Sequence, residues 1–89
     1  MSDLCYVCEH SPATETHHIF NASMRKKSEE YGATIRVCRE CHDYIHSHPK
    51  YMLILKKTFQ FKIMSEYNLT EEDFRAIFHK SYLGVDYED

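Results

Sequence analysis

The chain has 89 residues, a formal net charge of −3 and 28% charged residues. This length predicts one domain, at the small end of what a hydrophobic core alone can support, so stabilisation by a structural metal is expected. No segment approaches the ~18 apolar residues of a membrane-spanning helix. The N-terminal Met-Ser-Asp-Leu-Cys stretch has neither the basic region nor the apolar run of a secretory signal, which predicts a cytoplasmic protein.

The chain contains two Cys-x-x-Cys pairs, formed by Cys5 with Cys8 and by Cys38 with Cys41. Without an export signal, such pairs favour metal binding over disulfides, a redox pair or unrelated buried thiols. Four thiolates at about 2.3 Å would complete the tetrahedron of a structural zinc and leave no open position. The sequence therefore predicts a structural zinc site that ties residues 9–37 into a loop.

The first half of the chain predicts a knuckle and two strands. Residues 4–12 should form the zinc knuckle, with a turn near its Ser-Pro dipeptide. Residues 14–20 are rich in β-favoured types and residues 33–37 alternate weakly, so we expect them to pair as strands. Between them, the polar residues 23–31 indicate a loop or a short helix that ends at the following glycine.

Three helices are predicted in the second half. The first runs from about residue 38 to 47, where Pro49 breaks or restarts the helix. The second covers residues 50–66, and its apolar face is predicted to contain Tyr51, Leu55, Phe59 and Ile63, widened by Met52, Ile54 and Met64. Thr70 is the expected N-cap of the third. Its apolar side is predicted to contain Phe74, Ile77, Phe78 and Tyr82.

The histidines suggest a second metal site. His42 and His46 are four residues apart, so on a helix both imidazoles project from one face and can bind one ion. Neighbouring residues of a strand point to opposite sides. One member of the His17-His18 pair can therefore bind the ion while the other, in a locally distorted strand, faces a substrate. Three imidazoles with open positions are typical of a catalytic rather than a structural site.

Charge is distributed unevenly along the chain. Residues 24–67 carry nine Lys or Arg against five Asp or Glu, whereas residues 84–89 form an acidic tail. Arg25, Lys26 and Lys27 make the densest basic cluster, which in most proteins is only a solvated face. Beside a histidine metal site, the same cluster becomes a candidate for contacts with the phosphates of DNA.

These residues resemble a known family. The run Thr-His-His-Ile-Phe at residues 16–20, a loop, a strand and then Cys-x-x-Cys-His-x-x-x-His at residues 38–46 resemble the ββα-metal fold of HNH endonucleases with a zinc knuckle. A longer resemblance, over almost the whole chain, is to small phage proteins related to the recombination-enhancement, RecA-dependent nucleases (Ref-like proteins). It includes the Arg-Lys-Lys-Ser-Glu-Glu-Tyr-Gly stretch at residues 25–32 and the Phe-x-x-Ile-Phe-x-x-x-Tyr-Leu segment at residues 74–83.

The resemblance implies a metal-dependent DNA endonuclease that leaves a 5′-phosphate and a 3′-hydroxyl. His18 would be the general base that takes a proton from the attacking water, since an imidazole titrates near neutral pH. His17, His42 and His46 would hold one divalent ion on the scissile phosphate. The implied partners are DNA and RecA-type filaments, and the implied location is the cytoplasm of a bacterial host, for a phage or prophage protein.

Two details of the implied site stay open. Three imidazoles favour Zn²⁺, Ni²⁺, Co²⁺ or Mn²⁺, whereas binding by only His17 and one of the two helical histidines would admit Mg²⁺ or Mn²⁺. Many HNH proteins also place an asparagine just before the second strand, and residues 30–35 contain none. The nearest is Asn21, three residues after His18. This departure bears on catalytic efficiency more than on the fold.

We therefore predict a small α+β domain over residues 1–83. It comprises a ββα-metal core stabilised by the four-cysteine zinc site and followed by two C-terminal helices, with residues 84–89 as a tail. The predicted function is that of an HNH-type DNA endonuclease. The main alternative is a non-catalytic zinc-binding module for DNA or protein partners, and a regulator made during phage infection is a third possibility.

Overall fold

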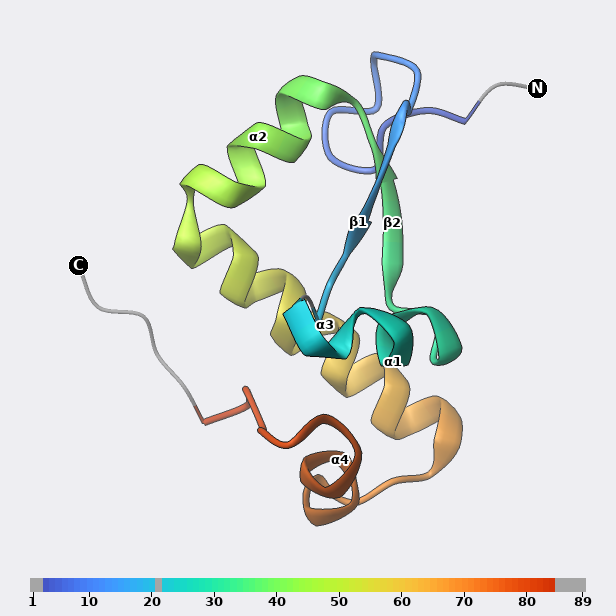
Figure 1. The fold of residues 1–89 in the computed structure, drawn as a ribbon, viewed down its shortest axis with the longest axis vertical. Coiled ribbons are helices and arrows are strands. Elements are labelled where there is room, and N and C mark those ends of the chain that lie inside the picture. Colours follow the sequence, from blue (N-terminus) through green and yellow to red (C-terminus); the bar gives the residue numbers. More distant parts are fainter. Residues whose placement is uncertain (1–2, 21, 85–89) are drawn as a thin grey trace.

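The structure, a computed structural model, describes residues 3–20 and 22–84. Its strands are β1 (Glu15–His18) and β2 (Thr34–Val37), and its helices are the 3-10 turn η1 (Ala22–Met24), α1 (Arg25–Glu30), α2 (Arg39–Ser47), α3 (Pro49–Tyr67) and α4 (Glu71–Phe78). This is the small α+β architecture that the sequence predicts (Figure 1). None of these helices is long and apolar enough to cross a bilayer. Apart from Gly84, the predicted acidic tail lies outside the described residues.

The two strands form an antiparallel hairpin at the centre of the molecule. Glu15 lies opposite Val37 and His17 opposite Ile35. The amide of Ile19 still donates to the carbonyl of Ala33 at 3.0 Å, so pairing continues one step past β1. In Figure 1, α2 begins at one end of the hairpin beside the N-terminal loop, and α1 lies at the other end. The hairpin therefore separates a cysteine-containing end from an α1 end.

The boundaries of α3 follow local sequence signals. Pro49 occupies the first turn of α3, where its missing N–H leaves no hydrogen bond unmade. Asn68 ends the helix in the left-handed region, with φ of 55°. The predicted helix of residues 50–66 is thus confirmed within one residue at each end, and Pro49 restarts the helical chain rather than ending it.

The start of α4 is confirmed and its end is corrected. The Thr70 hydroxyl accepts from the Asp73 amide at 3.1 Å, and the Asp73 carboxylate accepts from the Thr70 amide at 3.0 Å. This capping box lowers the pKa of Asp73. The helix stops at Phe78, because His79 is left-handed with φ of 68°. The prediction that Tyr82 lies on this helix is wrong; Tyr82 belongs to the segment that follows.

The core fills the space between the hairpin, α3 and α4. Phe20 follows β1 directly and is 2% exposed. Its ring centroid lies 4.7 Å from that of Phe78 and 5.6 Å from that of Phe74, so aromatic packing joins α4 to the end of the hairpin. Other buried aliphatic and aromatic side chains come from the strands, from residues next to them and from the helices: Ile19, Ala33, Ile35, Val37, Ile45, Leu55, Phe59 and Ile63.

The apolar face of α3 is narrower than predicted. Leu55, Phe59 and Ile63 are buried, but Ile54 is 57% exposed. One residue corresponds to a rotation of about 100° around a helix, so Ile54 points away from its buried neighbour Leu55. Phe61 lies seven residues, almost two full turns, after Ile54 and is also exposed. Ile54 therefore does not widen the core face.

A buried serine attaches α1 to the hairpin. Ser28 is fully buried, and its hydroxyl donates to the Phe20 carbonyl at 2.6 Å and accepts from the Phe20 amide at 2.9 Å. The Ser28 carbonyl also accepts from the amide of Ala33 at 2.7 Å. One side chain thus satisfies two buried backbone groups at the point where β1 ends. This contact fixes the position of α1 relative to the histidines of β1.

We expect Ser28→Ala to lower the free energy of unfolding by about 3 kcal/mol, because it leaves both backbone groups of Phe20 buried without a partner. Guanidinium unfolding in zinc-containing buffer measures the loss. Ser65→Ala, at an exposed position of α3, is the matched control and should change stability by less than about 0.5 kcal/mol. Equal effects of the two substitutions would contradict the role assigned to Ser28.

Candidate functional site

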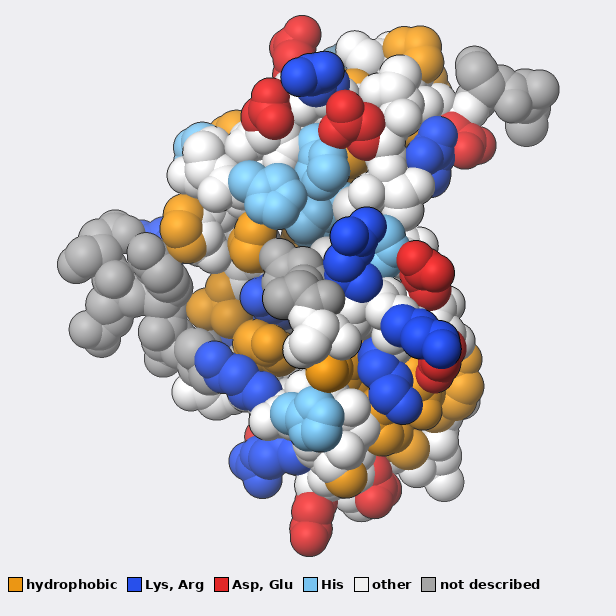
Figure 2. Space-filling view, in the orientation of Figure 1, with side chains coloured by type: hydrophobic (Ala, Val, Ile, Leu, Met, Phe, Trp, Pro, Cys, Tyr) orange, Lys and Arg blue, Asp and Glu red, His pale blue; other side chains and the backbone are white. Residues whose placement is uncertain are grey.

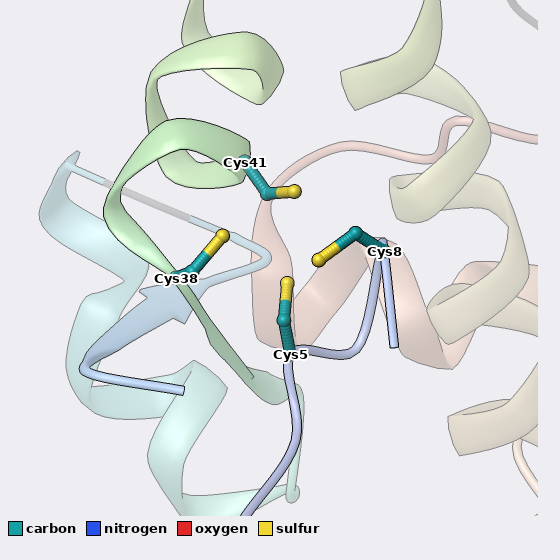
Figure 3. A group of neighbouring side chains, drawn as sticks. All are labelled: Cys5, Cys8, Cys38 and Cys41. Atoms are coloured by element: carbon teal, nitrogen blue, oxygen red, sulfur yellow. The ribbon is translucent and has the colours of Figure 1, made fainter. Parts of the chain in front are cut away.

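Four cysteine side chains converge at the start of α2. Figure 3 shows Cys5 and Cys8 of the N-terminal loop pointing toward Cys38 and Cys41, and the four sulfur atoms all lie within 4.8 Å of one another. Cys38 is the residue that precedes α2 and Cys41 lies in its first turn. The structure therefore forms a four-cysteine cluster that could hold a structural metal such as zinc, as the sequence predicts.

The N-terminal loop is shaped by its backbone. The Cys5 amide donates to the Ser11 carbonyl at 2.8 Å, and the Tyr6 amide donates to the Arg36 carbonyl at 2.8 Å, which attaches the loop to β2. Glu9 adopts φ of 58° and closes the turn. The turn therefore lies within residues 6–11, slightly earlier than predicted. Pro12 already pairs with Leu4 across an isolated bridge.

The protonation of the thiols fits a cation at the centre of the cluster. Burial raises the pKa of Cys5, but hydrogen bonds from the backbone of Cys8, Cys38 and Val7 outweigh it and lower the pKa to about 6. Burial and hydrogen bonds with the other three cysteines raise the pKa of Cys41. One thiolate therefore forms readily while its neighbour keeps a proton. Full ionisation of all four needs a positive ion among them.

Three imidazoles form a second cluster. The ring centroid of His17, on β1, lies 5.3 Å from the ring centroids of both His42 and His46. These two residues lie on α2, and their own ring centroids are 4.9 Å apart. One ring nitrogen of each falls within 4.8 Å of the others. The i, i+4 spacing on α2 thus places two imidazoles over the strand that carries the third. This cluster could also hold a metal ion.

His17 supplies the strongest sign of a ligand. It is 2% exposed, and its Nε2 is buried without any hydrogen-bond partner in the described part of the chain. Burial first, and then the neighbouring His42 and His46, lower the pKa of His17 to about 4, so the ring is neutral at pH 7. An unpaired buried nitrogen costs about 1–3 kcal/mol. A divalent cation bound by this nitrogen would remove that cost.

Glu15 orients one of the imidazoles. Its carboxylate accepts a hydrogen bond of 2.6 Å from Nδ1 of His42, which assigns the proton to Nδ1 and leaves Nε2 with its lone pair. That Nε2 lies 3.3 Å from Nε2 of His46, inside the cluster. A carboxylate that holds a ligating histidine in this way is common at metal sites. Glu15 was not predicted as a site residue, although its position two residues before His17 places both side chains on one face of β1.

His18 lies beside the cluster but outside it. Its Nε2 is 2.7 Å from a carboxylate oxygen of Glu29 on α1. A carboxylate can only accept, so the proton belongs to Nε2, and Nδ1 keeps a lone pair. Glu29 was also missed, because nothing local in the sequence connects α1 with β1. His18 and His17 both line one pocket of about 240 Å³, whose other lining residues are Thr16, Arg25, His42 and His46.

The predicted basic cluster separates in the structure. Arg25, the first residue of α1, lines the histidine pocket, whereas Lys26 and Lys27 do not. Lys26 is exposed and Lys27 is half-buried. In Figure 2, Lys and Arg side chains lie on the same face as the pale blue histidines, beside and below them. Asp and Glu side chains lie directly above the histidines in the same view. Positive charge therefore flanks the histidine cluster on one side only, in a chain whose net charge is −3.

Metal content should distinguish the two clusters. We expect zinc-loaded protein to retain one ion at the thiolates after mild chelation and to bind a second, exchangeable ion at the imidazoles. His42→Ala and His46→Ala should each remove the second ion and leave the first. His10→Ala, at an exposed position outside both clusters, is the control and should keep both. Elemental mass spectrometry after gel filtration counts the ions. One ion per wild-type chain in excess metal would contradict the second site.

The neutral His17 should make stability depend on pH. Its pKa is about 4 when folded and near 6.5 when unfolded, so between these values only the unfolded chain binds the proton. The free energy of unfolding should therefore fall as the pH is lowered from 6.5 toward 4. His17→Gln should weaken this dependence. Guanidinium unfolding of the wild type and of His17→Gln at several pH values measures this dependence. Both proteins lose thiolate-bound zinc in acid, so the difference between their pH slopes reports on His17. Identical pH slopes would contradict the burial of a neutral His17.

The order of the elements and the four-cysteine cluster can be compared with the resemblance to HNH endonucleases. The order β1, β2, α2 with a four-cysteine cluster at the start of α2 is compatible with a ββα-metal fold. No family model, curated protein or solved structure matches the chain. Membership of the HNH or Ref-like families therefore stays a prediction from the sequence motifs.

Proposed function

We propose that this protein is a metal-dependent DNA endonuclease of the HNH type. The observation that carries the proposal is a pocket lined both by His18, whose Nε2 is hydrogen-bonded to Glu29, and by three imidazoles that could hold a divalent ion. A base with a lone pair next to a Lewis acid is the combination that phosphodiester hydrolysis requires. A phage or prophage origin, RecA-type filaments as a partner and location in a bacterial cytoplasm belong to this proposal through the sequence resemblance.

In the proposed reaction, His18 activates the nucleophile. Nδ1 takes a proton from a water molecule as its oxygen attacks the phosphorus of a DNA phosphodiester. The P–O3′ bond breaks, and the O3′ leaves as a hydroxyl after taking a proton from solvent, so the products carry a 5′-phosphate and a 3′-hydroxyl. The ion bound by His17, His42 and His46 would offset negative charge on the phosphate and on the leaving oxygen.

Two further residues support this step. Glu29 accepts the Nε2–H of His18, which holds the ring and stabilises the positive charge that the ring acquires with the second proton. In this proposal Glu29 is a positioning residue for His18. Arg25 contributes a cation to the pocket lining, where its guanidinium can donate to a phosphate oxygen. Lys26 and Lys27 extend the positive surface along α1 as candidate contacts to the DNA backbone.

The proposal is tested by cleavage of single-stranded and duplex DNA with Mg²⁺, Mn²⁺, Ni²⁺ or Zn²⁺. We expect His18→Ala to slow cleavage by about 10²- to 10⁴-fold, the usual contribution of a general base, while DNA binding is retained. Glu29→Ala should slow it by about 10- to 100-fold. Glu29→Gln should restore part of the loss, because the amide oxygen still accepts the Nε2–H.

The controls are chosen near the site. Glu30→Ala changes the exposed neighbour of Glu29 on α1 and should leave the rate unchanged. His10→Ala tests for a general effect of losing an imidazole. Cleavage that persists in His18→Ala would contradict the role of the base and point to a contaminating nuclease. DNA binding without cleavage under every metal would instead favour a non-catalytic zinc module.

A further inference from the structure

Two lysine side chains converge on one aromatic ring. The Nζ of Lys56, on α3, lies 5.1 Å from the ring centroid of Tyr82, and the Nζ of Lys80 lies 5.2 Å from the same centroid. Each ammonium is attracted to the face of the ring. The two ammoniums nevertheless repel one another, and burial together with the charge of Lys80 lowers the pKa of Lys56. The fold therefore holds two like charges close together.

A buried glutamine keeps this arrangement in place. Gln60, on α3, is fully buried; its Nε2 donates to the Ser81 hydroxyl at 2.9 Å and its Oε1 accepts from the Tyr82 amide at 2.7 Å. The Ser81 hydroxyl in turn donates to a carboxylate oxygen of Glu71 at 2.6 Å. The segment after α4 is thus attached to α3 through Gln60 and to α4 through Glu71. Lys80 approaches Lys56 because of these hydrogen bonds.

Among the described residues, the paired lysines have no neutralising carboxylate. Within residues 3–20 and 22–84, no ion pair involves Lys56 or Lys80. Lys62 offers a contrast on the same helix: it lies 5.5 Å from the ring centroid of Phe59 and also pairs with Glu66 at 4.0 Å. An ammonium pair without a counter-charge attracts an anion, and bound anionic oxygens would relieve the repulsion.

The charge of Lys56 is one of those that lower the pKa of His17, so Lys56 lies within electrostatic range of the histidine pocket, although it does not line it. We propose that Lys56 and Lys80, seated on the Tyr82 ring, form a subsite for a backbone phosphate of the nucleic acid bound at the histidine pocket. The inference rests on the proposed function. A nucleic acid strand carries a phosphate at every nucleotide, so a strand that enters the pocket presents further phosphates to cations nearby. Figure 2 shows basic side chains continuing on the histidine face.

The salt dependence of DNA binding tests the subsite. All proteins in this test are zinc-loaded and carry His18→Ala, so that no cleavage occurs. The parent is His18→Ala alone, and each variant adds one or both lysine substitutions. We expect Lys80→Gln to reduce the slope of log K against log salt by about 0.9 on duplex or 0.7 on single-stranded DNA, the value for one phosphate contact. Affinity at 0.1 M salt should fall about five- to tenfold. Lys56→Gln with Lys80→Gln should lose at least as much.

Lys62→Gln is the matched control. It also removes one ammonium from above an aromatic ring, but from a lysine that already has a carboxylate partner. Its salt slope should equal that of the parent. Lys80 is exposed, so Lys80→Gln keeps the test valid even where the change at half-buried Lys56 affects folding. An unchanged slope in Lys80→Gln, or an equal loss in Lys62→Gln, would overturn the subsite.

Pyrophosphate provides a readout that does not depend on nuclease activity. In NMR titrations of the zinc-loaded chain, we expect shifts of the Ser81 and Tyr82 amides that disappear in Lys80→Gln and persist in Lys62→Gln. If these shifts occur but the wild type binds no DNA, the anion site stands and the nuclease proposal fails. If DNA is bound and cleaved but the shifts and the slope change are both absent, the subsite fails and the nuclease proposal stands.

Discussion

The convergence of four cysteines at the start of α2 is the constraint on which the rest of the structure depends. Cys5 and Cys8 come from the N-terminal loop, and Cys38 and Cys41 from the start of α2. A cation that offsets their charge would hold these two segments together, in a chain whose core is small. It would also fix the N-terminal end of α2 against the hairpin. The imidazoles of α2 meet His17 of β1 because this end of the helix is held.

Carboxylates organise the histidine pocket. Glu15 accepts from His42 and Glu29 accepts from His18, so each directs one imidazole and assigns its tautomer. His17 is neutral for a different reason, which is burial. The pocket region therefore combines one imidazole hydrogen-bonded to Glu15, a second hydrogen-bonded to Glu29, and a buried third whose Nε2 has no hydrogen-bond partner among the described residues. These differences arise within one small cluster of identical side chains.

Most of the fold could be predicted from local signals. Pro49, the capping box of Thr70 and Asp73 and the left-handed Asn68 set helix boundaries through contacts within a few residues, so patterns in the sequence reveal them. The errors occur where long-range packing decides. Ile54 fits an apolar pattern yet faces outward, and Tyr82 leaves the helix because the segment after α4 is bound by the buried Gln60 of α3.

By itself, the sequence determined the ligand types and their pairing: the Cys-x-x-Cys and His-x-x-x-His spacings act through the local geometry of a turn and a helix. The tertiary structure alone decided which partner each imidazole has. It placed Glu29 against His18, and it brought two lysines separated by 24 residues onto one tyrosine ring. Contacts between distant segments depend on how the elements pack, and no spacing along the chain encodes them.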